Sequence, residues 1–326
     1  MIDTNKIYDV AVIGSGPSGL TAAIYTTRGA LSTAIVGGSS WGGQLMLTSE
    51  VDNFPGFPEG IMGPTLMENM KNQAVRFGAE FIQDNVIKVD FSKKPFQLFT
   101  SDSTLNAKSI IIATGAEIKW LGVKGEKELI GRGISSCAPC DAPFFKEKYV
   151  LVVGGGDSAM EEALVLTKYA SKVTIIHRKS EFKASMAMQE KVFANKKIDV
   201  IWDTEITEVK GESKFEGVDL INKLTNQTSQ LVADGLFVAI GHNPTSDLFK
   251  GLIDLDDKGY ILKNNKLQIT NDKQITNNKF ETMTNIDGVF VSGDIHDHTY
   301  KQAITAAGYG CMAGMEVVNY IADLKS

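Results

Sequence analysis

An α/β protein with two Rossmann-like dinucleotide-binding units is predicted, because one sequence pattern occurs twice. The first copy, IYDVAVIGSGPSGLTAAIYTTRG, is a short β-branched run, a glycine-rich turn and an amphipathic stretch of helical period. The second copy, KYVLVVGGGDSAMEEALVLTKYA, repeats the same order. A single glycine-rich turn is weak evidence, but two copies, each placed between a strand and a helix, disfavour two unrelated turns.

Small residues stand where a dinucleotide site requires them in both copies. The first position permits a tight turn, the second lets the backbone approach a pyrophosphate, and the third lets the helix pack closely on the strand. The free N–H groups at the start of the helix then face the negative charge. The positions are Gly14, Gly16 and Gly19 in the first copy, and Gly154, Gly156 and Ala159 in the second.

Composition and charge narrow the class of protein. The 326-residue chain carries a formal charge of −6, which disfavours nucleic acid and anionic membrane surfaces as partners. No apolar run approaches the roughly 20 residues that a membrane span needs. The N-terminal residues resemble no signal peptide, so a cytoplasmic location is expected.

Two of the three cysteines lie close together in SCAPCDAPFF, as Cys137 and Cys140. Such a pair is half a zinc site, a structural disulfide or a redox pair. A zinc site needs about four ligands, and none of the four histidines forms a second paired motif. Structural disulfides are rare in the cytosol, and Cys311 lies in an apolar helical pattern, which predicts a small buried residue. No metal site is therefore expected, and a redox pair is favoured.

A cationic cluster follows the strand after the second copy. Sites for NAD usually place an acidic residue there to bind the ribose 2′-OH. Here the strand VTII ends in His177, Arg178 and Lys179, with Lys183 close behind. Positive charge suits a 2′-phosphate, so NADPH is predicted rather than NADH. The alternative is a solvated basic face.

The first copy also lacks the acidic residue, so its nucleotide must be held in another way. Two further apolar strands end in small residues, one at Ala113, Thr114 and Gly115 and the other at Gly293 and Asp294. Small residues let the backbone lie against a flat cofactor. The Asp294 carboxylate could accept a hydrogen bond from a sugar or ribityl hydroxyl. Together with two dinucleotide turns, these features predict FAD.

The chain resembles the low-molecular-weight thioredoxin reductases of the flavoprotein pyridine-nucleotide disulfide oxidoreductases. The resemblance covers nearly the whole chain and rests on motifs in family order: GSGPSGLTAAIY, GGQLMLTSEVDNFPGF, ATGA, SCAPCDAPFF, GGGDSAMEEAL, HRK, VAIGHNP and VSGDIHDHTYKQAITAAGYG. The position of the cysteine pair, just ahead of GGGDSA, is typical of this branch.

The resemblance implies two Rossmann-like domains, the second inserted into the first. Residues 1–116 and 245–326 would form the FAD-binding domain, and residues 117–244 the NADPH-binding domain with the cysteine pair. The implied FAD contacts are Gly14, Ser15, Gly16, Pro17, Gly19, Gly43, Gln44, Leu45, Asn53, Thr114, Gly115, Asp294, Lys301, Gln302 and Ala303. The implied NADPH contacts are Gly154, Gly156, Asp157, Ser158, Ala159, His177, Arg178, Lys179 and Lys183.

The implied activity is that of a homodimeric enzyme, a thioredoxin-disulfide reductase that passes electrons from NADPH through FAD and the Cys137–Cys140 disulfide to thioredoxin. Cys137 would attack thioredoxin, Cys140 would face the flavin and Asp141 would be the acid–base group. For Asp141 a helix N-cap is the alternative. Other disulfide acceptors (a peroxiredoxin or a glutaredoxin-like protein), a ferredoxin/NADP-type flavin reductase and a non-enzymatic redox sensor remain alternatives for the whole chain.

Three features depart from the family pattern. Arginine is usual where Lys179, Lys183 and Lys301 stand, and lysine lacks the bidentate fork of arginine. Pro139 between the cysteines removes a backbone N–H and stiffens the loop. The Asn-rich segment 264–285 is longer than usual, and its composition predicts a surface hairpin or loop.

Overall fold

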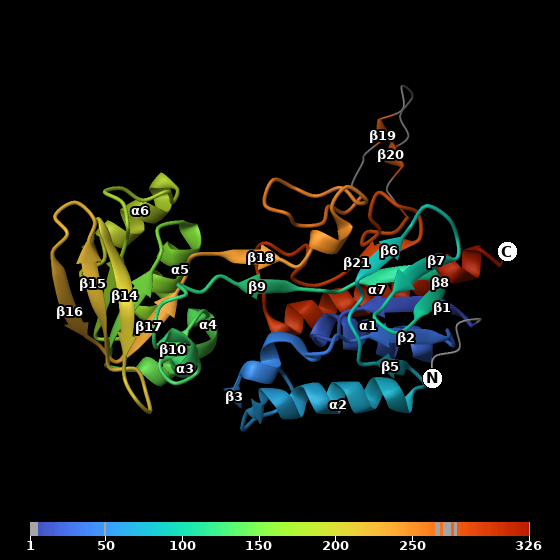
Figure 1. Ribbon diagram of the computed structural model, residues 1–326, viewed down its shortest axis with the longest axis horizontal. Helices are drawn as coiled ribbons and strands as arrows, with labels where there is room; N and C mark the ends of the chain where they lie inside the picture. Colours follow the sequence, from blue (N-terminus) through green and yellow to red (C-terminus); the bar gives the residue numbers. More distant parts are fainter. Residues whose placement is uncertain (1–5, 49, 265–267, 270–274, 277–278, 326) are drawn as a thin grey trace. The chain divides into compact units, whose positions relative to one another are not determined.

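The chain folds into two compact units. The computed structural model describes residues 6–48, 50–264, 268–269, 275–276 and 279–325 (Figure 1). One unit comprises Met1–Glu117 with Asn243–Ser326, and the other comprises Ile118–His242. The two chain crossings pair with each other as strands β9 (Ala116–Ile118) and β18 (His242–Pro244). Each unit contains a sheet with parallel strands and covering helices, so the predicted α/β class is confirmed.

The first unit is built on a seven-stranded sheet. Its strand order is β5 (Glu80–Ile82), β2 (Thr33–Val36), β1 (Ile7–Ile13), β8 (Thr104–Ile112), β7 (Phe96–Phe99) and β6 (Lys88–Asp90), with β21 (Val289–Val291) paired to β8. Strands β1, β2, β5, β8 and β21 run parallel. Ile13 is in register with Ile112, which is in register with Val291. The carboxyl ends of β1, β8 and β21 therefore meet at one edge of the sheet.

Apolar side chains cover both faces of this sheet. On one face they come from α1 (Pro17–Arg28), α2 (Gly63–Arg76) and α7 (Ala303–Asp323), with Leu20, Met67 and Val317 among the buried residues. The opposite face carries a second cluster that includes Phe96, Leu98 and Phe249. Burial on both faces agrees with the continuous apolar runs at the carboxyl ends of β1 (residues 10–13) and β8 (residues 110–112).

Helices α1 and α7 lie side by side (Figure 1) because glycine occupies their contact. A Cβ atom on Gly310 would lie 2.2 Å from the Ser18 carbonyl oxygen, and one on Gly314 would lie 2.9 Å from the Ala22 carbonyl oxygen. Side chains larger than hydrogen would force the helices apart. The helix of the first glycine-rich turn is therefore held against the last helix of the chain.

Short elements complete the first unit. They are the 3₁₀ turns η1 (Gly43–Leu47) and η3 (Asp247–Phe249) and the strands β3 (Glu50–Val51), β4 (Ile61–Met62), β19 (Gln268–Ile269) and β20 (Ile275–Thr276). Strands β19 and β20 pair in antiparallel fashion within the segment where a hairpin or loop is predicted. The residues between them, and their neighbours at 265–267 and 277–278, lie outside the described part of the chain.

The second unit contains a five-stranded parallel sheet. Its order is β10 (Ile134–Ser135), β17 (Gly235–Val238), β11 (Tyr149–Val153), β12 (Lys172–Ile176) and β13 (Ile198–Ile201). Its helices are α3 (Glu126–Leu129), α4 (Ala138–Asp141), α5 (Asp157–Leu166) and α6 (Met186–Phe193), with the 3₁₀ turn η2 (Ala142–Phe145) after α4. The predicted strand–turn–helix of the second copy is thus β11, its glycine turn and α5.

A three-stranded antiparallel sheet also belongs to the second unit. It consists of β14 (Thr204–Lys210), β15 (Gly217–Asn222) and β16 (Thr228–Val232). Ile206, Val218 and Leu220 from this sheet join Leu151 and Leu236 of the parallel sheet in one apolar cluster.

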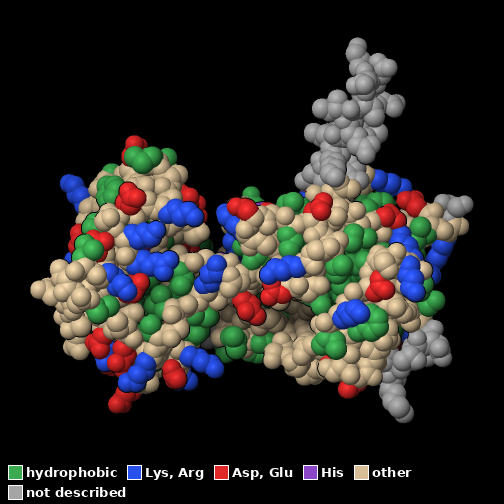
Figure 2. Space-filling view, turned by 45° about the horizontal axis from the view of Figure 1, so that its top comes forward, with side chains coloured by type: hydrophobic (Ala, Val, Ile, Leu, Met, Phe, Trp, Pro, Cys, Tyr) green, Lys and Arg blue, Asp and Glu red, His purple; other side chains and the backbone are tan. Residues whose placement is uncertain are grey.

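The charged surface agrees with the balanced composition. On the face shown in Figure 2, basic and acidic side chains are interspersed over each unit. None of the helices within the described residues combines the length and the apolarity that crossing a membrane requires.

Candidate functional site

The first glycine-rich turn has the backbone that a dinucleotide requires. Gly14 has a φ of 114°, and a Cβ atom there would lie 2.2 Å from the Ala113 carbonyl oxygen. A Cβ atom on Gly19 would lie 2.1 Å from the Gly14 carbonyl oxygen. At Gly16, by contrast, no heavy atom of the described residues lies within 4 Å of that position. Two glycines are therefore needed for packing, and the third leaves open space for a ligand.

Ser15 fixes the loops around this turn. Its buried hydroxyl donates to the Gly37 carbonyl oxygen at 2.7 Å and accepts from the Gly42 N–H at 2.9 Å. The neighbouring Gly43 approaches so closely that a Cβ atom on it would lie 3.6 Å from the Gly16 Cα. The structure thus brings the predicted residues of segments 14–19 and 43–45 together.

Asp294 leaves one buried oxygen without a partner. It follows β21 and belongs to the same sheet edge as Gly14 and Ala113. Among the described residues, no group forms a hydrogen bond with its Oδ1. Burial, together with the charge of Asp297, raises the pKa of Asp294 to about 6, whereas the charge of Lys301 lowers it. A ligand hydroxyl that donates to this carboxylate would satisfy the oxygen and favour the ionised form.

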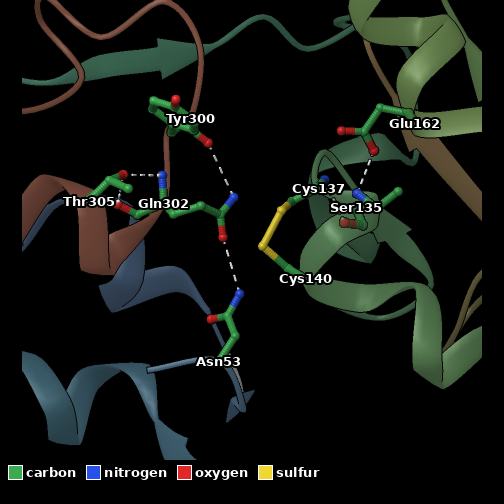
Figure 3. Close-up of a disulfide and its surroundings, with 9 residues drawn as sticks. Asn53, Ser135, Cys137, Cys140, Glu162, Tyr300, Gln302 and Thr305 are labelled. Atoms are coloured by element: carbon green, nitrogen blue, oxygen red, sulfur yellow. Dashed lines mark hydrogen bonds between the residues drawn. A yellow bond between two sulfur atoms is a disulfide. The ribbon is translucent and has the colours of Figure 1, made fainter. Parts of the chain in front are cut away.

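The start of α7 is held by reciprocal hydrogen bonds. The Gln302 N–H donates to the Thr305 hydroxyl at 3.2 Å, and the side chain of Gln302 caps the Thr305 backbone in return. Asn53 Nδ2 donates to Gln302 Oε1 at 3.1 Å (Figure 3). Ala303 is the first residue of the helix. Gln302, Ala303 and Asn53, three of the predicted FAD contacts, therefore lie together.

Other predicted FAD contacts are held by backbone interactions in the same unit. Gln44 donates from Nε2 to the Ala116 carbonyl oxygen, and Thr114 donates from its hydroxyl to the Thr245 carbonyl oxygen at 2.8 Å. Gly115 accepts from the Thr245 N–H at 3.0 Å. Lys301 has a φ of 47°, and its ammonium donates to the His298 carbonyl oxygen at 2.7 Å.

The second glycine-rich turn repeats the geometry of the first. Gly154 has a φ of 153°, and a Cβ atom there would lie 2.4 Å from the Ala239 carbonyl oxygen and 2.7 Å from the Ala159 Cβ. No described heavy atom lies within 4 Å of the corresponding position on Gly156. Asp157 begins α5, and its Oδ1 accepts from the Ser185 N–H and hydroxyl at 2.9 and 2.7 Å.

The predicted cationic cluster lies beside this turn. The Lys183 N–H donates to the Gly155 carbonyl oxygen at 2.8 Å, and the side chains of Arg178, Lys179 and Lys183 are exposed. The His177 ring packs under Gly155, and its Nε2 lies 2.9 Å from the Glu181 carbonyl oxygen. His177 thus shapes the loop, while the three cations remain accessible to an anionic group.

Cys137 and Cys140 form a disulfide with a Cα–Cα distance of 5.3 Å. Cys137 precedes α4, and the N–H groups of Cys140 and Asp141 donate to its carbonyl oxygen at 3.1 and 3.0 Å. Pro139 lies in the first turn of α4, where a missing N–H costs no helical hydrogen bond. The Ser135 hydroxyl accepts from the Cys137 N–H at 3.0 Å (Figure 3).

The side chain of Asp141 lies next to the disulfide and does not cap the turn that follows it. It precedes η2, but its side chain makes no capping hydrogen bond, so the alternative of a side-chain cap is wrong. Burial raises the pKa of Asp141, and a hydrogen bond from Ser135 lowers it in part. A carboxyl group with a raised pKa next to two sulfurs is suited to donate a proton.

Sequence reasoning missed Glu162. This half-buried residue of α5 accepts the Ala138 N–H, directly beside Cys137 (Figure 3). In the sequence it is one of two adjacent glutamates in an amphipathic helix, and nothing local distinguishes it from an exposed position. Cys311 also differs from expectation: it lies in α7 as predicted, but it is only partly buried.

Two dinucleotide turns and a disulfide in a Cys-x-x-Cys segment define a nucleotide-dependent disulfide oxidoreductase. The sequence model of the family described as "Pyridine nucleotide-disulphide oxidoreductase" matches residues 8–310, and the chain belongs to this family. It is therefore an oxidoreductase of the FAD- and NADPH-dependent type.

Several similar proteins are named thioredoxin reductase. The chain is 48% identical to a thioredoxin reductase of Rickettsia prowazekii (strain Madrid E) over 316 residues, which cover 96% of this chain and 97% of the relative. It is 48% identical to a thioredoxin reductase of Streptomyces coelicolor over 323 residues, which cover 98% and 96%. A crystal structure of thioredoxin reductase from Streptococcus pyogenes MGAS5005 superimposes with a TM-score of 0.88 at 38% identity, covering 98% of this chain and 99% of that one.

Proposed function

We propose that the chain is a thioredoxin-disulfide reductase that uses NADPH, FAD and the Cys137–Cys140 disulfide. The observation that carries the proposal is this disulfide, which lies in the same unit as the second dinucleotide turn. The names of the relatives support thioredoxin as the acceptor.

The first unit, Met1–Glu117 with Asn243–Ser326, is assigned to FAD. The open position at Gly16 and the unpartnered oxygen of Asp294 support the assignment, because one suits a pyrophosphate and the other a ribityl or ribose hydroxyl. The remaining contacts are Ser15, Pro17, Gly43, Gln44, Leu45, Asn53, Thr114, Gly115, Lys301, Gln302 and Ala303. Bound FAD supplies the conversion between hydride transfer and thiol chemistry.

The second unit, Ile118–His242, is assigned to NADPH. The open position at Gly156 would accept the pyrophosphate, and Asp157, Ser158 and Ala159 would follow it along α5. The exposed Arg178, Lys179 and Lys183 would bind the 2′-phosphate through charge-assisted hydrogen bonds. His177 would support their loop.

The reduced cysteines carry out two exchanges. The Cys137 thiolate attacks one sulfur of the thioredoxin disulfide, and the mixed disulfide forms as the other thioredoxin sulfur leaves and takes a proton from Asp141. The Cys140 thiolate then attacks the Cys137 sulfur, which restores the enzyme disulfide and releases the second thioredoxin sulfur. Electrons and sulfur–sulfur bonds balance, since one disulfide is reduced and one is formed.

The family resemblance extends the proposal to assembly and location. A homodimer in the cytoplasm, without nucleic-acid or membrane partners, is the proposed state. Gel filtration with light scattering measures the mass directly, and a mass near twice 35.4 kDa is expected.

Insulin reduction driven by NADPH, with and without added thioredoxin, tests the function. Activity that requires thioredoxin is expected. Activity with a peroxiredoxin or a glutaredoxin-like protein, but none with thioredoxin, would assign a different acceptor. Cys140→Ser should abolish electron transfer to thioredoxin and leave the yellow flavin bound, and Cys311→Ser is the matched control that should change neither.

A further inference from the structure

The Cys137–Cys140 segment packs on α5 through apolar side chains and is joined to it by a hydrogen bond to one carboxylate. Glu162 Oε2 accepts the N–H of Ala138, the residue between Cys137 and Pro139 (Figure 3). Ser135 meets the same segment from the other side by accepting the Cys137 N–H. The backbone on both sides of the Cys137 Cα is therefore tied to polar side chains.

A second carboxyl group lies in this network. Asp141 ends α4 and accepts a hydrogen bond from Ser135. Ser135 thereby links Asp141 to the Cys137 N–H, and Glu162 binds the next N–H along the chain. Two carboxyl groups consequently face one short segment that carries the reacting sulfurs.

We propose that Glu162 is a positioning residue for the disulfide chemistry: it anchors the turn between Cys137 and Ala138 and, by its charge, governs the protons on Asp141 and Cys137. The proposal rests on the proposed function of this disulfide, because it assigns a role in the same reaction.

The surroundings of Glu162 make its charge effective. Helix α5 meets η2, β11, β12 and α6 through apolar side chains, including Phe145, Val150, Ile175 and Val192. Burial raises the pKa of Glu162 to about 7, the bond from Ala138 lowers it, and the charges of Asp141 from α4 and Glu161 from α5 raise it. In apolar surroundings, two adjacent negative charges repel more strongly than they do in water.

The reaction requires such control. Breaking the Cys137–Cys140 bond consumes two electrons and yields a dithiol if two protons are bound, or one thiol and one thiolate if one is bound. The electrons come from NADPH through the flavin of the established family activity. When Glu162 is ionised, its charge disfavours a further negative charge on Asp141 or on Cys137. Asp141 then retains the proton that a departing thiolate needs.

The pH dependence of cysteine alkylation in the reduced holoprotein tests this role. The protein is reduced with dithiothreitol, desalted under argon and pulsed with iodoacetamide between pH 5 and pH 9.5. Peptide mass spectrometry then resolves Cys137 from Cys140 and Cys311. Only the thiolate reacts, so the midpoint of the Cys137 profile reports its acidity without thioredoxin, and failure of the proposed acceptor leaves this readout intact.

Glu162→Gln keeps the shape and the acceptor oxygen but removes the charge. The midpoint for Cys137 should fall by roughly one pH unit, because a nearby like charge has been deleted. Glu162→Asp keeps the charge but withdraws the carboxylate by one methylene, so an intermediate shift is expected. The matched control is Glu190→Gln, which removes one exposed carboxylate from α6 of the same unit and should leave the midpoint unchanged.

Equal midpoints for Glu162→Gln and Glu190→Gln would overturn the proposal and leave Glu162 a structural role only. If circular dichroism shows that Glu162→Gln does not fold, the midpoint of Cys137 alkylation in Glu162→Asp is compared with that in Glu190→Gln instead. An unshifted midpoint in Glu162→Asp would then overturn it.

Discussion

Asn53 donates a hydrogen bond to Gln302, 249 positions further along the chain, with an Nδ2–Oε1 distance of 3.1 Å. Asn53 lies in the loop between β3 and β4, whereas Gln302 caps α7. This bond orients the amide of Gln302 at a helix start that is assigned to the flavin.

Replacing Asn53 should weaken FAD binding. Asn53→Ala removes the donor and frees the Gln302 side chain, at a cost of about 1 kcal/mol, or roughly fivefold in affinity. Flavin absorbance after dialysis, titrated back with FAD, measures the change. Asn195→Ala removes an asparagine that bonds Thr167 in the other unit, and its FAD affinity should equal that of the unchanged protein. An equal loss of FAD affinity in both variants would show that Asn53 does not contribute to the FAD site.

Two glycines of one turn should respond differently to a methyl group. Gly14→Ala combines a φ of 114° with a contact at 2.2 Å, so a loss of about 2 kcal/mol or more in the free energy of unfolding is expected. At Gly16 the backbone is extended, with a φ of −69°, and the position of an added methyl group is open. Gly16→Ala should therefore retain its stability but lose bound FAD. Urea unfolding of the flavin-free proteins and flavin content separate the two effects. A Gly16→Ala variant that keeps its FAD would contradict the assignment of the open space to the pyrophosphate.

The affinity for FAD should rise with pH as the carboxyl group of Asp294 ionises. The pKa of its carboxyl group is about 6 in the ligand-free protein, and a hydroxyl donor favours the ionised form. Fluorescence titrations should therefore show tighter binding as the pH rises from 5 to 7. Asp294→Asn should bind FAD more weakly at pH 7 and lose this pH dependence, and an unchanged slope would refute the contact.

The same carboxyl group sets a stability change in the flavin-free protein. The pKa of Asp294 is raised from 3.8 to about 6, so the folded state favours its protonated form. The resulting contribution to the free energy of unfolding is fully present below pH 3.8 and is lost as the pH rises through about 6. Asp294→Asn should therefore be more stable than the unchanged protein at pH 8, on the order of 3 kcal/mol, with the advantage shrinking towards pH 4. Urea unfolding at both pH values provides the measurement, and a constant difference would argue against burial of the charge.

Preference for NADPH should depend on the exposed cations near Gly155. Lys179→Ala should raise the KM for NADPH by roughly tenfold and leave the KM for NADH nearly unchanged, because a charge-assisted bond to the 2′-phosphate is lost. Lys179→Arg should lower the KM for NADPH, since arginine adds a bidentate fork. Lys148→Ala, a lysine next to β11 in the same unit, is the control. Parallel changes for NADPH and NADH would show that Lys179 does not contact the 2′-phosphate.

The parts of this molecule that sequence could predict are those that depend on local rules. Gly14 and Gly154 were identifiable because a turn between strand and helix requires small residues. The end of β8 and strand β21 were identifiable because they are buried apolar runs. Their common edge follows from parallel pairing. Contacts set by tertiary packing were not accessible: the side of α5 that carries Glu162 meets Ala138 only once α4 has docked. The hydrogen bond between Asp141 and Ser135, six positions earlier, is likewise set by the fold, and Asp141 makes no capping bond.

The glycine contacts of α7 with α1 have a consequence for flavin choice. With Gly310 against Ser18 and Gly314 against Ala22, the two helices cannot slide along each other without a steric clash. The start of α1 follows the open position at Gly16, and the start of α7 carries Gln302 and Ala303. The close packing therefore keeps the two helix starts at a fixed separation within the first unit. We expect FAD, which carries a second nucleotide, to contact both helix starts, and a mononucleotide flavin such as FMN to contact one of them only.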